Sequence, residues 1–218
     1  MHRGFAPLWR RAVVVTAMAA LWAAPGALAA APKPKPVSDP HYGEVLFYFY
    51  QQKYFSALGH LMTAQHFGRF AHHADEAELL RGGLLLSYGV HLEAGRIFER
   101  LIAQGVAPEI RDRAWFYLAK IRYQRGYQEE AEDALSRIEA RLPGELEDER
   151  HMLHAFLLMQ RGRYAEAVER LQRIDRRSEV ARYGRYNLGV ALIRANDSER
   201  GTALLDEIGR EPAATEEF

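Results

Sequence analysis

Cysteine is absent from the 218 residues of this chain. Without thiols the chain cannot form disulfides, thiolate metal sites or a lipid-modified cysteine at a processed N-terminus. An excess of charge is missing as well, because 29 Lys and Arg residues balance 29 Asp and Glu residues. Arginine alternates with glutamate instead of forming a basic patch, so nucleic acid is not an expected partner.

Long hydrophobic runs are also scarce, and the single notable stretch lies near the N-terminus. Residues 12–24 are apolar, but this stretch falls short of the roughly 20 residues that cross a bilayer. Three arginines precede it, and small residues at Ala27 and Ala29 follow it, which is the layout of a secretory signal. We therefore predict a signal peptide over residues 1–29, cleaved after Ala29, and export to the bacterial periplasm. A membrane anchor is the alternative interpretation.

Residues 30–40 read AAPKPKPVSDP, and four of these residues are proline. Such a segment favours an extended, semi-rigid tether. At its end Asp39 and Pro40 form a helix start signal, in which we expect the carboxylate to cap the free amides. Residues 41–218 are of ordinary size for one domain.

Motifs for catalysis and for metal binding are missing too. No Ser or Cys nucleophile motif, glycine-rich phosphate loop or paired-carboxylate pattern stands out, so an enzyme is not expected. Two histidine pairs, His72 with His73 and His151 with His154, lack the further ligands of a zinc site. We expect these histidines to be solvated, and we expect neither a metal nor another cofactor.

A helical repeat is what the sequence does contain. Small residues recur 37, 37, 36 and 34 positions apart, at Ala57, Ala94, Ala131, Ala167 and Gly201. Apolar residues recur at three- and four-residue steps through ten segments. These predicted helices are 40–51, 54–67, 75–88, 91–103, 109–124, 128–141, 145–160, 164–174, 179–195 and 198–209. Short connections between them require antiparallel neighbours, so the sequence predicts a string of helical hairpins.

The repeat unit resembles the tetratricopeptide repeat, in which a glycine marks the turn and an alanine lies early in the second helix. The residues that carry the resemblance are Ala57, Gly89, Ala94, Trp115, Gly126, Ala131, Pro143, Gly162, Ala167, Leu188 and Gly189. Gln52 and Asn196 stand where the first and fifth units should have glycine. The resemblance implies an all-α, right-handed solenoid of about five hairpins, with repeats near 41–70, 75–108, 112–143, 148–178 and 182–212.

In this family the first helix of each unit lines a concave face that binds other proteins. Carried over by register, that face is apolar and aromatic, which suits a partner helix or an extended peptide. Its expected residues are Tyr42, Leu46, Phe49, Leu86, Phe116, Lys120, Tyr123, Met152, Phe156, Met159, Tyr186, Val190 and Ile193. The alternative is that part of this row is buried when the repeats stack.

The expected function is therefore that of an exported scaffold or adaptor of the cell envelope that binds a protein or peptide. A permanent subunit of an envelope secretion or polymer-export machine is the alternative, and a hydrolytic enzyme is less favoured. At the C-terminus, Thr215 begins what reads as a new helix. The last unit has no capping helix of its own in the predicted pattern, so we expect Leu188, Leu192, Leu205 and Ile208 to be partly uncovered. Further repeats, a second copy or a partner are expected to supply the cap.

Overall fold

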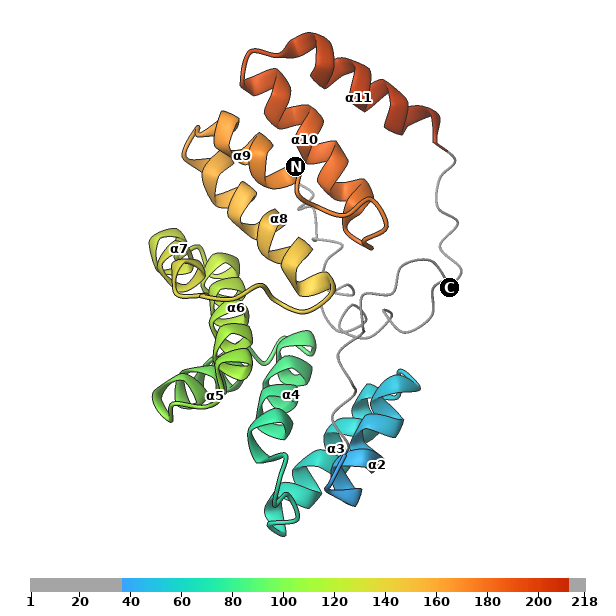
Figure 1. Cartoon of the computed structure of the whole chain (residues 1–218), viewed down its shortest axis with the longest axis vertical. Coiled ribbons are helices and arrows are strands. Elements are labelled where there is room, and N and C mark those ends of the chain that lie inside the picture. Colours follow the sequence, from blue (N-terminus) through green and yellow to red (C-terminus); the bar gives the residue numbers. More distant parts are fainter. Residues whose placement is uncertain (1–36, 212–218) are drawn as a thin grey trace, which may run out of the picture. The chain divides into compact units, whose positions relative to one another are not determined.

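The structure is a computed structural model, and it describes residues 37–211 (Figure 1). Within that range the chain forms ten α-helices and no strand. The helices are α2 (Pro40–Tyr50), α3 (Tyr54–His66), α4 (Ala74–Ser87), α5 (His91–Ala103), α6 (Pro108–Gln124), α7 (Gln128–Ser136), α8 (Glu145–Gln160), α9 (Tyr164–Leu171), α10 (Ala181–Arg194) and α11 (Ser198–Arg210). The all-α class is confirmed. None of the helices in this range has the length and apolar character needed to span a membrane.

The chain divides after Leu142 into two compact units. Within the described residues the first unit holds the hairpins α2–α3, α4–α5 and α6–α7, and the second holds α8–α9 and α10–α11. The two helices of every hairpin pack along each other. In the first unit α3 also packs on α4 and α5 on α6, and in the second unit α9 packs on α10. Each unit is thus a series of hairpins packed in chain order.

The recurring small residues lie where the two helices of a hairpin approach each other. Ala57, Ala94, Ala131 and Ala167 have no exposed surface. Four positions after each of them a large apolar side chain is buried, namely Leu61, Phe98, Leu135 and Leu171. The small residue permits the close approach, and the large one fills the space beside it. In α11 the equivalent residue is Gly201, where a Cβ would lie 2.7 Å from the backbone oxygen of Gly189.

The five hairpin turns share one backbone conformation although their residues differ. The φ angles are 79° at Gly89, 83° at Gly126 and 73° at Gly162. Gln52 and Asn196, at the equivalent positions, also have positive φ angles of 60° and 68°. This left-handed conformation suits glycine, is tolerated by asparagine and is strained for glutamine. All five turns therefore keep the geometry that the repeat requires.

Two helices end earlier than the sequence pattern predicted. α7 ends at Ser136 instead of near residue 141, and α9 ends at Leu171 instead of near residue 174. Ile138 and Leu142 continue the helical spacing and are buried, but they project from an irregular segment. The apolar pattern therefore extended the expected helix too far, because loop residues can also supply buried side chains.

The expected role of Asp39 as the cap of its own helix is wrong. Its carboxylate makes no hydrogen bond to the start of α2. It accepts instead from the backbone amides of His72 and His73, both at 2.8 Å, and of Ala71 at 3.3 Å. Asp39 is buried, and it holds the connection that leads from α3 into α4.

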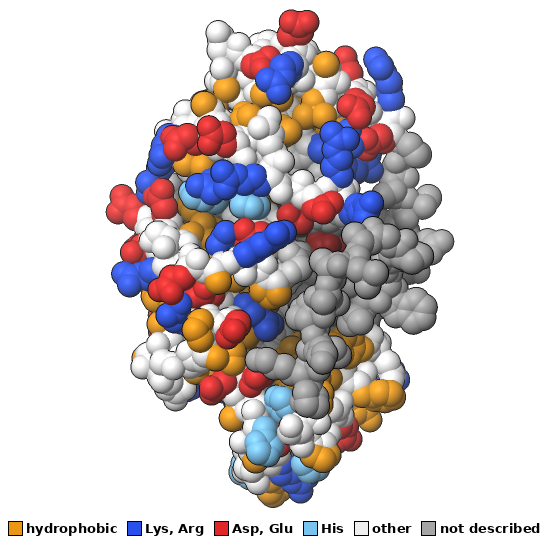
Figure 2. Space-filling view, in the orientation of Figure 1, with side chains coloured by type: hydrophobic (Ala, Val, Ile, Leu, Met, Phe, Trp, Pro, Cys, Tyr) orange, Lys and Arg blue, Asp and Glu red, His pale blue; other side chains and the backbone are white. Residues whose placement is uncertain are grey.

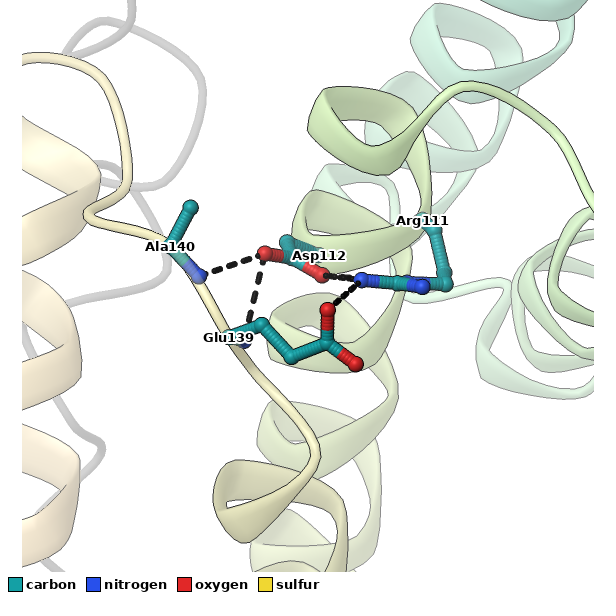
Figure 3. Close-up of polar contacts among 4 residues, drawn as sticks. All are labelled: Arg111, Asp112, Glu139 and Ala140. Atoms are coloured by element: carbon teal, nitrogen blue, oxygen red, sulfur yellow. Dashed lines mark hydrogen bonds and ion pairs between the residues drawn. The ribbon is translucent and has the colours of Figure 1, made fainter.

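The same contact recurs at the start of α6. Asp112 is buried, and it accepts hydrogen bonds from the backbone amides of Glu139 at 3.2 Å and Ala140 at 2.8 Å (Figure 3). Arg111 donates to the other carboxylate oxygen of Asp112 and pairs with Glu139 at 2.7 Å. The first helix of this hairpin therefore fixes the segment that follows the second helix.

We call this contact the return clamp, and it is also present in the second unit. Asp148, at the equivalent position of α8, accepts from the amide of Asp175 at 3.1 Å, and Glu145 accepts from the amide of Glu179. Burial has the largest effect on Asp148 and raises its pKa. For Asp39, burial alone would raise the pKa of the carboxyl group. The three backbone hydrogen bonds that it accepts outweigh this effect, so the pKa of Asp39 lies below its usual value.

The C-terminal hairpin is more closed than expected. Leu192 and Ile208 are buried, so the expectation that they are left uncovered is wrong for these two residues. Leu188 and Leu205 are half-buried. The expected signal peptide, most of the tether and the helix start at Thr215 lie outside the described residues.

Candidate partner-binding surface

In the first unit, α2 and α4 bury much of the expected groove row. Phe49 joins a core cluster and Leu86 is buried, whereas Tyr42 and Leu46 are half-buried. The ring of Tyr42 stacks on His73 with 4.9 Å between the centroids. Burial, with a smaller contribution from Glu76, raises the pKa of Tyr42 to about 12. Tyr42 therefore acts mainly as a packing residue in this structure.

On α6 the expected row is still less accessible. Phe116 is fully buried and Lys120 is 1% exposed, while Tyr123 is half-buried. The Lys120 ammonium lies 5.5 Å from the centre of the Phe116 ring, which allows a cation–π contact. A partner could touch Phe116 and Lys120 only after a rearrangement. These two residues therefore do not form an open groove here, because the helix face that carries them has almost no exposed surface.

In the second unit more of the expected groove row is accessible. Met152 is buried, but Phe156 and Met159 on α8 are half-buried and border the core cluster around Ala167. Tyr186 on α10 is 51% exposed. Val190 and Ile193, further along α10, are half-buried.

Tyr183 is a residue of this surface that the sequence analysis missed. Its ring is half-exposed and makes a T-shaped contact with the ring of Phe156, with 5.9 Å between the ring centroids. This contact joins the exposed faces of α8 and α10. The signal in the sequence was spacing, since Tyr183, Tyr186 and Val190 follow one another at three- and four-residue steps on α10. We call Phe156, Met159, Tyr183, Tyr186 and Val190 the α8–α10 face.

The other repeat-signature residues take structural places. Gly89, Gly126 and Gly162 form the turns, and Pro143 lies in the irregular segment between α7 and α8. Trp115 is half-buried, and the Arg137 guanidinium lies 5.1 Å from the centre of its ring. Leu188 and Gly189 lie on α10, and a Cβ at Gly189 would meet Leu205 at 2.7 Å.

The histidines of α8 are less solvated than expected. His151 is 8% exposed, so the expectation of a solvated side chain is wrong for this residue. Its Nε2 atom lies 3.4 Å from Glu147, and burial lowers its pKa. Burial, followed by the positive charges of Arg170 and Arg150, lowers the pKa of His154 to about 4. The described residues contain no group of three or more side chains that could hold a metal ion.

Comparison with known proteins gives no relative by sequence. No family model matches the chain, and no curated protein matches it. Solved structures do match it in fold, and each of the three cited next covers 78% of this chain.

The three structures cited here are of tetratricopeptide-repeat proteins. One contains the TPR-like repeats of a kinesin light chain from Podosopora anserina, with 15% identity, 92% of its length covered and a TM-score of 0.54. The TPR protein YrrB, described as having an unusual peptide-binding site, has 17% identity, 83% coverage and a TM-score of 0.54. MamA from Desulfovibrio magneticus RS-1 has 14% identity, 92% coverage and a TM-score of 0.55. The described part of the chain therefore has the tetratricopeptide-repeat fold.

Proposed function

We propose that this chain is an exported scaffold of the bacterial cell envelope that binds a protein partner on the α8–α10 face. The fold supports this proposal, because stacked helical hairpins present extended surfaces for other proteins. The exposure of Tyr186 and Tyr183 is the observation that carries it, since aromatic side chains dominate the energetics of protein interfaces. A partner helix or an extended peptide suits an apolar helix face of this kind.

Export is supported by the sequence of residues 1–29 alone. We expect the chain in an envelope fraction to begin at Ala30, and mass spectrometry of the intact protein measures this directly. A chain that retains residues 1–29 and fractionates with the cytoplasm would contradict export while leaving the binding proposal open to its own test.

Site-specific photocrosslinking tests the partner surface. A photoreactive amino acid in place of Tyr186 should capture a protein from envelope extract. The same substitution at Tyr127 is the matched control, since Tyr127 is exposed to a similar extent but lies in the α6–α7 turn. A captured protein should then bind the purified chain, and the variant Tyr186→Glu should weaken that binding while Tyr127→Glu leaves it unchanged.

A second variant tests the deeper part of the face. Phe156→Glu together with Met159→Glu should abolish partner binding and leave the helical circular dichroism nearly intact. Both residues also border the core, so loss of folding in this double variant would assign them to packing. In that case the Tyr186→Glu measurement decides the proposal. Equal capture at Tyr186 and Tyr127 would refute it, and partner release only under denaturing conditions would favour a permanent subunit of a larger machine.

A further inference from the structure

Exposed apolar side chains are concentrated on the first hairpin, α2–α3. In the described residues twelve large hydrophobic side chains are exposed, and six of them lie between Val37 and Phe67. Phe55 is the most exposed of all, at 80%, and Phe47 and Phe67 are about 60% exposed. We call Phe55, Met62 and Phe67, which lie on α3 or directly after it, the hairpin surface.

These side chains are not part of the hairpin core. The buried residues of α3 are Ala57, Leu61 and Ala64, which lie on a different face from Phe55 and Met62. Phe55 and Met62 are seven residues apart and so share one face of α3. A Cβ added to Gly59, between them, would have no other atom within 4 Å. The outer face of α3 is therefore open along this stretch.

The charge of the hairpin differs from the rest of the chain. Glu44 is the only acidic residue between residues 40 and 74, and the same stretch contains Lys53, Arg69 and five histidines. The carboxylate of Glu44 already lies 3.3 Å from His60. The Arg69 guanidinium lies 4.9 Å from the centre of the Phe67 ring, so a cation accompanies one of the exposed aromatic side chains. Figure 2 shows hydrophobic and histidine side chains together over α2 and α3.

We propose that the hairpin surface docks onto the surface of an anionic phospholipid bilayer. Protruding aromatic side chains enter the boundary between headgroups and acyl chains, and neighbouring Lys and Arg residues are attracted to anionic lipids. The near absence of carboxylates removes the repulsion that such a surface would otherwise meet.

Fluorescence from a single labelled site tests this proposal on the full chain. Since the chain has no cysteine, Gly59→Cys can carry one environment-sensitive dye such as NBD. Gly209→Cys is the matched control, because Gly209 is also helical and a Cβ there would have no other atom within 4 Å. Vesicles made of equal parts phosphatidylglycerol and phosphatidylcholine should shift the emission of the dye at position 59 to the blue, and leave the dye at position 209 unchanged.

A pair of variants tests the aromatic contribution. In the Gly59→Cys background, Phe55→Ser should weaken vesicle binding about tenfold, from the loss of one inserted ring. Leu92→Ser, on the exposed surface of α5, should leave binding unchanged. Both substitutions remove exposed side chains, so neither disturbs the core.

Several results would overturn the proposal. One is sedimentation of the chain with vesicles without any shift in the emission of the dye at position 59, since binding would then use another part of the chain. Equal binding to pure phosphatidylcholine vesicles would remove the role of charge. A blue shift that grows with protein concentration without lipid would assign the hairpin surface to a second copy, and a shift produced only by envelope proteins would assign it to a protein partner.

Discussion

Removal of the carboxylate of Asp112 should destabilise the first unit. Asp112 is buried and accepts hydrogen bonds from the amides of Glu139 and Ala140 and from Arg111. The variant Asp112→Ala leaves both amides without this acceptor and, among residues 37–211, leaves Arg111 with Glu139 as its one acidic partner. The change tests whether the return clamp contributes to stability or only accompanies the fold.

The expected cost follows from the kind of hydrogen bond that is lost. Each hydrogen bond to a charged group contributes about 1.5–3 kcal/mol. Glu139 and Ala140 are exposed residues, so water can replace part of the lost interaction. We therefore expect Asp112→Ala to lower the free energy of unfolding by about 2–4 kcal/mol. Asp112→Asn retains one acceptor oxygen and should lose about half as much.

Asp75 provides a matched control for this measurement. It occupies the equivalent position at the start of α4, but no described residue donates a hydrogen bond to its side chain. Asp75→Ala should therefore change stability by less than about 0.5 kcal/mol. Urea unfolding can be followed by the fluorescence of Trp115, the only tryptophan in the described residues, which lies on the same helix as Asp112. Equal losses in the Asp112 and Asp75 variants would refute the reasoning, as would unchanged hydrogen exchange at the amides of Glu139 and Ala140.

Three further predictions concern the turns, the last hairpin and pH. Gln52→Gly should raise the free energy of unfolding by about 1 kcal/mol by removing left-handed strain, and Asn196→Gly should raise it less, both measured by urea unfolding. Gly201→Ala should cost about 1–3 kcal/mol, because the new Cβ would lie 2.7 Å from a backbone oxygen of α10. Gly209→Ala, where the space is open, should instead stabilise α11 slightly in thermal unfolding. Since the pKa of His154 is lowered to about 4, folding favours its neutral form, so stability should fall as the pH drops from 6.5 towards 4. His154→Gln should flatten that part of the profile of stability against pH.

The hairpins were predictable because one physical requirement repeats along the chain. A small residue must recur wherever two helices meet closely, and Ala57, Ala94, Ala131 and Ala167 record that requirement in the sequence. Even Gln52 could be placed correctly at a turn, because its position in the period counts for more than its own preference for the left-handed conformation.

The accessible surface was harder to predict. The register places Phe116 and Tyr186 on equivalent faces of their helices, yet one is fully buried and the other is half-exposed. Register specifies the direction of a side chain from its own helix, whereas burial depends on what lies beside that helix. The hairpin surface was missed for a related reason: Phe55 lies on a second helix, outside the row in which the family pattern places partner contacts.

Polar interactions with the backbone were missed because their partners are distant in sequence. Asp39 lies directly before a helix, and the local pattern therefore favours a cap. Its actual donors lie more than 30 residues away, at His72 and His73. A clue was nevertheless present, since Asp39, Asp75, Asp112 and Asp148 are 36, 37 and 36 residues apart, close to the spacing of the small residues.

The lengths of the connections explain why only some of these aspartates form the return clamp. Where the clamp is present, the connection is long: residues 67–73 for Asp39, 137–144 for Asp112 and 172–180 for Asp148. The connection in the repeat of Asp75 consists only of residues 104–107. A longer irregular segment contains more backbone amides that have no partner within a helix, and each of these amides needs an acceptor from water or from a side chain. A carboxylate from the first helix satisfies some of these amides and fixes the segment against the hairpin. The clamp is therefore a consequence of connection length, and a long connection without an aspartate at this position should exchange its amide hydrogens faster.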